Sequence, residues 1–194
     1  MTKRSYYVVN GITVYRLIAA PVMIVLIITG NLDIFKWLLP VSFFTDLIDG
    51  YLARKFKVIS IMGAKLDSIA DDLTIVAAIV GLFFFKLSFI REEITWVVIL
   101  LALYLLETIF SLTRYRKLSG FHTYIAKCAA LFQGFFLIFI FLLNQPIYWL
   151  FYSAAILTAI DLMEEITLIF LLPKWEANVK GIYWVLMRKR KAKK

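Results

Sequence analysis

Residues 46–71 read DLIDGYLARKFKVISIMGAKLDSIAD, and this stretch decides the expected fold because it places four aspartates in an otherwise apolar chain. Asp46 and Asp49 are three residues apart, and Asp67 and Asp71 are four apart, so each pair shares one face of a helix. Small residues beside both pairs would let two such helices approach closely. The spacing therefore predicts two neighbouring helices whose acidic faces meet.

Four carboxylates that meet near a bilayer need a counter-charge, because desolvation and like-charge repulsion both oppose their ionisation. Two divalent cations would cancel the four charges. A set of carboxylate oxygens without nearby His or Cys favours Mg²⁺ or Mn²⁺ over zinc. The alternative is that the aspartates are ordinary solvated residues near a helix end.

The same stretch fits the pattern D-x2-D-G-x2-A-R-x8-G-x3-D-x3-D at every fixed position, namely Asp46, Asp49, Gly50, Ala53, Arg54, Gly63, Asp67 and Asp71. This pattern resembles the signature of the CDP-alcohol phosphatidyltransferases, and the chain length agrees with single-domain members of that family. The resemblance implies an enzyme of phospholipid biosynthesis. Such an enzyme transfers a phosphatidyl group from CDP-diacylglycerol to an alcohol, releases CMP and uses two divalent cations, Mg²⁺ or Mn²⁺.

The resemblance also implies roles for individual residues. Asp46, Asp49, Asp67 and Asp71 would hold the metal ions, and Asp71 would also act as the catalytic general base. Binding of the nucleotide and its diphosphate would fall to Gly50, Ala53, Arg54 and Gly63 of the signature and to Asn10, Thr13 and Arg16, which resemble the family's N-x2-T-x2-R opening. For the last three, helix capping and interfacial anchoring are the alternatives, and for Arg54 it is a topology-setting charge.

The composition predicts an all-α, polytopic membrane protein, since 62% of the 194 residues are hydrophobic. We expect a single domain over residues 1–194, with six transmembrane helices around a cytoplasm-facing polar cavity. The apolar runs place these spans near residues 10–28, 34–53, 64–85, 94–112, 124–143 and 147–172. The single cysteine excludes an intrachain disulfide.

Basic residues set the expected orientation. Lys and Arg gather before the first span, between the second and third, between the fourth and fifth, and in the terminal RKRKAKK. By the positive-inside rule both termini face the cytoplasm, in a multi-pass protein of a bacterial inner or cell membrane. The tail over residues 174–194 is expected either to lie at the interface on anionic lipid or to anchor the topology. The net charge of +9 is therefore not taken as a sign of nucleic-acid binding.

The acceptor alcohol is the open question within the family. Arg114, Arg116 and Lys127 could form a cationic pocket for an anionic acceptor, and glycerol 3-phosphate is the preferred one. Snorkelling to lipid phosphates explains Arg116 equally well. Serine, inositol phosphate and phosphatidylglycerol remain alternatives. A homodimer is expected from the resemblance alone.

Four further acids, Glu107, Asp161, Glu164 and Glu165, fall at membrane depth and are not part of the signature. Pairing with Arg16, Lys65 or Lys127, or a contact across a dimer, would account for them.

Two other functions fit a membrane protein with paired aspartates. Intramembrane prenyltransferases also bind Mg²⁺ and a diphosphate between two helices, but they lack the signature found here. A divalent-cation transporter would need polar groups across the whole bilayer, whereas these aspartates gather at one face.

Overall fold

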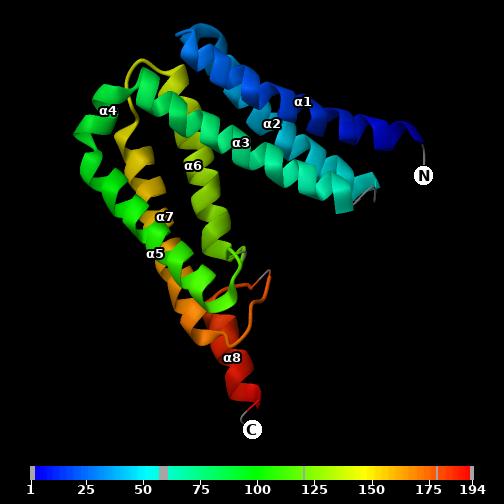
Figure 1. Cartoon of the computed structure of the whole chain (residues 1–194), viewed down its shortest axis with the longest axis vertical. Helices are drawn as coiled ribbons and strands as arrows, with labels where there is room; N and C mark the ends of the chain where they lie inside the picture. The colour runs from blue at the N-terminus through cyan, green and yellow to red at the C-terminus, as the bar shows by residue number, and fades with distance from the viewer. Residues whose placement is uncertain (1–2, 57–60, 120, 178, 193–194) are drawn as a thin grey trace. The chain divides into compact units, whose positions relative to one another are not determined.

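The computed structural model describes residues 3–56, 61–119, 121–177 and 179–192, and every regular element in these ranges is an α-helix. Figure 1 shows the eight helices of these ranges coloured along the chain. They are α1 (Lys3–Ile28), α2 (Leu32–Phe56), α3 (Ile61–Phe85), α4 (Leu87–Glu92), α5 (Ile94–Tyr115), α6 (Tyr124–Leu142), α7 (Tyr148–Leu171) and α8 (Ile182–Ala192). The all-α prediction is confirmed for the described part of the chain.

Each of the six predicted spans coincides with a long helix, namely α1, α2, α3, α5, α6 and α7. Among the described residues, the helices Ile94–Tyr115 and Tyr124–Leu142 are long and apolar enough to cross a membrane. Large apolar side chains face outward on both helices, and Leu101 and Leu131 are each 55% exposed. That all six helices cross the bilayer stays a prediction.

The chain divides into two compact units. Unit 1 comprises residues 1–91 and 140–144, and unit 2 comprises residues 92–139 and 145–194. The single domain expected over residues 1–194 stays a prediction.

Unit 1 is built on α1, which packs against both α2 and α3, while α2 also contacts α3. Figure 1 shows the three helices running side by side. The buried face of α1 consists of residues spaced three and four apart: Arg16, Ala19, Ala20, Met23 and Ile27. This spacing gives a single stripe on a helix, so the arginine continues the line of the apolar core.

A tight turn reverses the chain between α1 and α2. Gly30 has a φ of 71°, and the N–H of Asn31 donates to the carbonyl of Leu26 at 2.8 Å. Glycine adopts this left-handed conformation without the steric cost that a Cβ brings, and the bond closes the end of α1. Arg16 and Asp46 lie at nearly equal distances along the chain on either side of Gly30. The hairpin therefore brings them to the same level.

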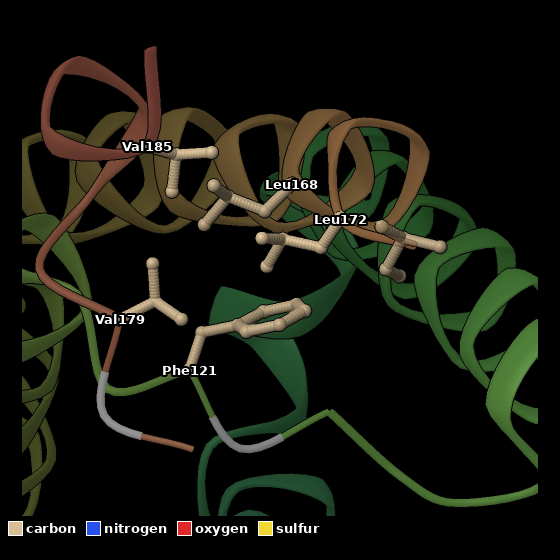
Figure 2. Close-up of a cluster of buried hydrophobic side chains, with 6 residues drawn as sticks. Phe121, Leu168, Leu172, Val179 and Val185 are labelled. Atoms are coloured by element: carbon tan, nitrogen blue, oxygen red, sulfur yellow. The ribbon is translucent and has the colours of Figure 1, made fainter. Parts of the chain in front are cut away.

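The core of unit 2 contains an apolar cluster at the end of α7, five of whose side chains are labelled in Figure 2. Its buried members are Phe121, Leu168, Ile169, Leu172, Val179 and Val185. The cluster joins the α5–α6 loop, the end of α7 and the start of α8. The loop and the tail are thus fixed against α7.

A hydrogen bond ties the end of α5 to the end of α7. The hydroxyl of Tyr115 donates to the carbonyl of Leu172, with an oxygen–oxygen distance of 2.8 Å. Since Tyr115 is the last residue of α5 and Leu172 caps α7, the bond holds the two helix ends together in unit 2.

Candidate functional site

The four aspartates lie on two helices that both pack on α1. Asp46 and Asp49 belong to α2, and Asp67 and Asp71 belong to α3. Side chains are described for Asp46 and Asp71, whereas those of Asp49 and Asp67 lie outside the described residues. The same holds for the side chains of the other predicted nucleotide-binding residues apart from Arg16, namely Asn10, Thr13, Ala53 and Arg54, and for the surroundings of Gly50 and Gly63.

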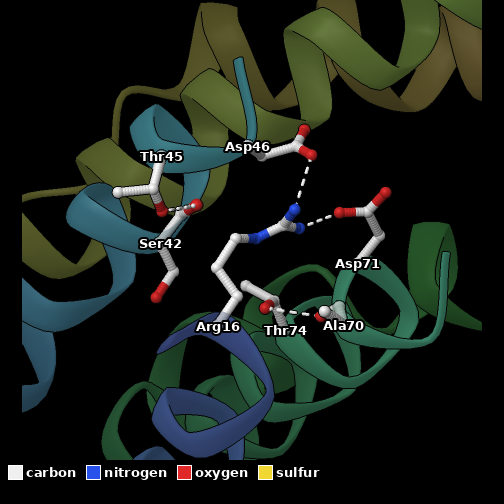
Figure 3. Close-up of polar contacts among 7 residues, drawn as sticks. All are labelled: Arg16, Ser42, Thr45, Asp46, Ala70, Asp71 and Thr74. Atoms are coloured by element: carbon white, nitrogen blue, oxygen red, sulfur yellow. Dashed lines mark hydrogen bonds and ion pairs between the residues drawn. The ribbon is translucent and has the colours of Figure 1, made fainter. Parts of the chain in front are cut away.

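Arg16 joins the two described aspartates, as Figure 3 shows. Its Nη1 lies 2.7 Å from Oδ1 of Asp46, and its Nη2 pairs with Oδ1 of Asp71. The planar guanidinium presents its donors as a fork, which suits two carboxylates that approach from different helices. The acidic residue of α2 and that of α3 therefore meet at one cation supplied by α1.

Burial differs sharply between the cation and its partners. The Arg16 side chain is 2% exposed, whereas the side chains of Asp46 and Asp71 are 35% and 37% exposed. The guanidinium is thus held inside unit 1, while both carboxylates keep part of their surface open. A ligand can reach the carboxylates from outside without displacing the core.

Short hydroxyl side chains accompany the ion pairs. Thr45 donates to the carbonyl of Ser42 at 2.9 Å, and Thr74 donates to the carbonyl of Ala70 at 2.8 Å (Figure 3). Ser42 is fully buried, and its Oγ has no hydrogen-bond partner among the described residues. Ser42 lies one helical turn before Asp46, so the polar face of α2 extends inward beyond the ion pair.

The two carboxylates fit a divalent cation in chemistry and in placement. Carboxylate oxygens are ligands that Mg²⁺ and Mn²⁺ prefer, and the pair is close enough to share one guanidinium. Among the described side chains, however, no three Asp, Glu, His or Cys residues gather closely enough to hold a metal ion. The described pair is therefore half of the predicted set, and the other half stays a prediction.

The predicted acceptor residues all belong to unit 2. Arg114 donates to the carbonyl of Leu172 at 3.3 Å, and Lys127 lies with its Nζ 5.6 Å from the centre of the Tyr124 ring. Arg116 is exposed and caps α5 in a left-handed conformation. Each therefore has a local structural role, and a shared acceptor pocket stays a prediction.

Sequence reasoning missed the partners of Arg16. It placed this residue near the nucleotide or opposite the acids of the sixth predicted span, whereas the structure pairs it with Asp46 and Asp71. The spacing from Arg16 to Ala19, Ala20 and Met23 carried the signal, because it puts the arginine on the buried stripe of α1.

The helices and the acidic pair together define a class of protein: a helical protein with a carboxylate site between neighbouring helices. Two of its described helices are long and apolar enough to cross a membrane. A family model described as CDP-alcohol phosphatidyltransferase matches residues 6–163, so the chain belongs to that family. The resemblance seen in the sequence is confirmed. The matched range includes Arg16 and all four aspartates.

Curated relatives match over shorter segments. A protein of Cereibacter sphaeroides named CDP-diacylglycerol–glycerol-3-phosphate 3-phosphatidyltransferase is 39% identical over 80 residues, which is 39% of this chain and 36% of that protein. A protein of Haemophilus influenzae with the same name is 38% identical over 72 residues, covering 36% of this chain and 39% of its own length. The matches thus span less than half the length of either relative.

A third relative carries a different name. The cardiolipin synthase (CMP-forming)/mitochondrial hydrolase fusion protein of Schizosaccharomyces pombe is 42% identical over 62 residues, which is 32% of this chain and 10% of that protein. No solved structure matches the chain.

Proposed function

We propose that the chain transfers a phosphatidyl group from CDP-diacylglycerol to glycerol 3-phosphate and releases CMP. Membership of the CDP-alcohol phosphatidyltransferase family supports the reaction class, and the names of two relatives support the acceptor. The observation that carries the proposal is the meeting of Asp46 and Asp71 at Arg16, inside the range that the family model matches.

Asp46, Asp49, Asp67 and Asp71 would hold two divalent cations, Mg²⁺ or Mn²⁺. When bound, such ions neutralise the diphosphate of the donor and stabilise the charge that develops on the leaving CMP. The exposed edges of Asp46 and Asp71 suit this role, because both carboxylates are part-open while Arg16 holds them from the inner side.

Asp71 is our choice for the proton acceptor. Its Oδ1 pairs with Arg16, which orients the carboxylate and leaves Oδ2 to accept the proton of an alcohol. The alcohol oxygen would then form a bond to the phosphorus of the phosphatidyl group. The bond from that phosphorus to the oxygen of CMP would break, and CMP would leave with the electron pair.

The remaining residues complete the proposed site. Donor binding would involve Gly50, Ala53, Arg54, Gly63, Asn10, Thr13 and Arg16, and acceptor binding would involve Arg114, Arg116 and Lys127. We further propose six membrane spans around a polar cavity that opens to the cytoplasm, with both termini on that side and two copies forming a homodimer.

The proposal is tested with the purified full chain, CDP-diacylglycerol, Mn²⁺ and one acceptor at a time. We expect CMP release with glycerol 3-phosphate and a phosphatidylglycerophosphate product identified by mass spectrometry. Release with phosphatidylglycerol instead would move the assignment to the activity for which the Schizosaccharomyces pombe relative is named. Diphosphate release from a prenyl donor, or Mn²⁺ flux into liposomes without CMP release, would overturn it.

A further inference from the structure

Unit 2 contains a second group of acids that the donor site does not use. Glu107 lies on α5, and Asp161, Glu164 and Glu165 lie on α7, which packs against α5. Asp161, Glu164 and Glu165 are three and four residues apart on α7, and Glu107 and Glu164 are both buried, so the four acids lie in the same part of unit 2.

Two of these carboxylates are buried and incompletely bonded. Glu107 is 3% exposed and Glu164 is 9% exposed. Oε1 of Glu107 and Oε2 of Glu164 have no hydrogen-bond partner among the described residues. A buried carboxylate oxygen without a donor is costly, so these two atoms indicate a place for a group that donates hydrogen bonds.

Glu164 and Glu165 each accept a hydrogen bond from a residue near a helix end. Ser119 donates to Oε2 of Glu165 at 2.7 Å, and the N–H of Ile182 donates to Oε1 of Glu164 at 3.1 Å. Both donors lie outside the two apolar helices that can cross a membrane. Glu164 and Glu165 therefore lie next to loops, where headgroups or soluble molecules can approach, whereas Glu107 accepts from Thr108 of its own helix at 3.4 Å.

Close packing fixes this arrangement. Gly181 has a φ of 142°, and a Cβ at this position would lie 2.9 Å from Oε1 of Glu164. Phe121, between Ser119 and the start of α6, is fully buried in the apolar cluster of Figure 2. The loop and tail that donate to the carboxylates are thus held in place by the core of unit 2.

The described side chains supply no counter-charge to the four acids. Every ion pair recorded in the described ranges lies elsewhere, on Asp33, Asp46, Asp71 or Glu176. In particular, Lys127 faces the Tyr124 ring, so the pairing expected from the sequence is not formed by this lysine. A bound cationic group would supply the counter-charge that the described side chains do not.

A metal ion fits the geometry poorly. No three acidic, His or Cys side chains of the described residues are close enough to share one. A Mg²⁺ ion holds its oxygens at about 2.1 Å, whereas an ammonium nitrogen holds them at about 2.8 Å and directs three separate N–H donors. An ammonium group can therefore join carboxylates that are too far apart for a metal.

We propose that Glu107, Asp161, Glu164 and Glu165 form a binding site for a primary ammonium group, distinct in chemistry from the anion-handling donor site. The unbonded oxygens of Glu107 and Glu164 accept two of its N–H donors, and the net negative charge of the group selects a cation. The ammonium belongs either to an aminophospholipid headgroup or to a soluble amine.

Two matched pairs of probes test the site on the purified full chain. In the lipid arm, native mass spectrometry compares retention of phosphatidylethanolamine and phosphatidylcholine, which differ in whether the head nitrogen carries N–H donors. In the soluble arm, equilibrium dialysis compares ethylammonium and tetramethylammonium. We expect the probe with N–H donors to be preferred in at least one arm, and the arm that responds identifies the source of the amine.

Variants tie the preference to the proposed residues. Glu107→Gln and Glu164→Gln keep side-chain size and an oxygen acceptor but remove a charge, so each should weaken ammonium binding roughly ten- to a hundredfold. Glu176→Gln is the control, because Glu176 belongs to the same unit but pairs with Arg188. Thermal unfolding of Glu107→Gln without probe should match or exceed that of wild type, since the change removes an uncompensated buried charge.

Three results would overturn the proposal. The first is no preference for N–H donors in either arm, and the second is unchanged binding by both glutamine variants. The third is displacement of the amine by Ca²⁺ or Na⁺ at equal concentration, which would assign the group to an inorganic ion. None of these outcomes depends on CMP release, so the test stands apart from that of the proposed transferase activity.

Discussion

Replacement of Arg16 by methionine should destabilise the metal-free protein strongly. The arginine side chain is 2% exposed and joins Asp46 and Asp71. Removal of one partner from a buried ion pair costs about 3–5 kcal/mol, because the remaining charges lose their compensation. Both aspartates are about one-third exposed, so water screens part of this loss and we expect about 2–4 kcal/mol.

The corresponding fall in melting temperature is roughly 5–15 °C for a chain of this size, measured by thermal unfolding in detergent with a chelator present. Divalent cations should reverse much of it, because the two carboxylates freed from Arg16 become available to the ion. Saturation at a hundred times the dissociation constant contributes about 2.7 kcal/mol. Mn²⁺ should therefore raise the melting temperature of Arg16→Met by more than that of wild type.

Arg188→Met provides the matched control. It also removes an arginine from an ion pair, but Arg188 and Glu176 have side chains that are 58% and 38% exposed. Such a surface pair contributes about 0–1 kcal/mol, and the control should melt close to wild type. If Arg16→Met melts within two or so degrees of Arg188→Met, or if Mn²⁺ stabilises it no more than wild type, the ion-pair argument is refuted.

Two further predictions concern the donor site and the core of unit 1. Asp71→Asn should lower CMP release by roughly a thousandfold or more, because it removes a metal ligand and the proton acceptor. Asp33→Asn makes the same chemical change in an exposed pair at the start of α2 and should release CMP at the wild-type rate. Equal rates for the two variants would contradict the assignment. Gly81→Ala should lower the free energy of unfolding by about 1–3 kcal/mol, because the new Cβ would lie 2.8 Å from Cζ of Phe35. Gly134→Ala is the control: its Cβ would meet no neighbour within 4 Å among the described residues, so the change should be neutral or stabilising in thermal unfolding. A Gly81→Ala protein as stable as Gly134→Ala would show that the Phe35 ring moves aside freely.

The sequence predicted the helices well because their apolar runs are long and bounded by polar residues. The fifth predicted span, for example, was placed at residues 124–143, and α6 covers Tyr124–Leu142. The two helices that were not predicted lack such a run. α4 is only 6 residues long. α8 has consecutive basic residues in its last turn, so half of this helix is polar and a search for long apolar runs does not detect it.

The site could be predicted in part. Spacing alone placed Asp46 and Asp71 on helix faces that could meet, and the structure brings both to Arg16. The choice of Arg16 as their partner depends on the rotation of α1 about its own axis, which local spacing does not fix. The rotation of α1 follows instead from the burial of Ala19 and Ala20 where this helix packs on α2 and α3. Tertiary packing therefore decides which cation reaches the acids.

The two acidic groups of this chain differ in how their negative charge is balanced. Asp46 and Asp71 have a guanidinium from their own unit, so they can remain ionised and close together before any ion binds. Glu107 and Glu164 are more deeply buried and have no such cation among the described residues. A built-in cation suits a site whose charged ligand must enter and leave in each turnover, because the site keeps its shape in between. A site without its own cation, such as the one at Glu107, needs its ligand to balance the charge. A bound amine there should therefore dissociate more slowly than the substrates leave the donor site.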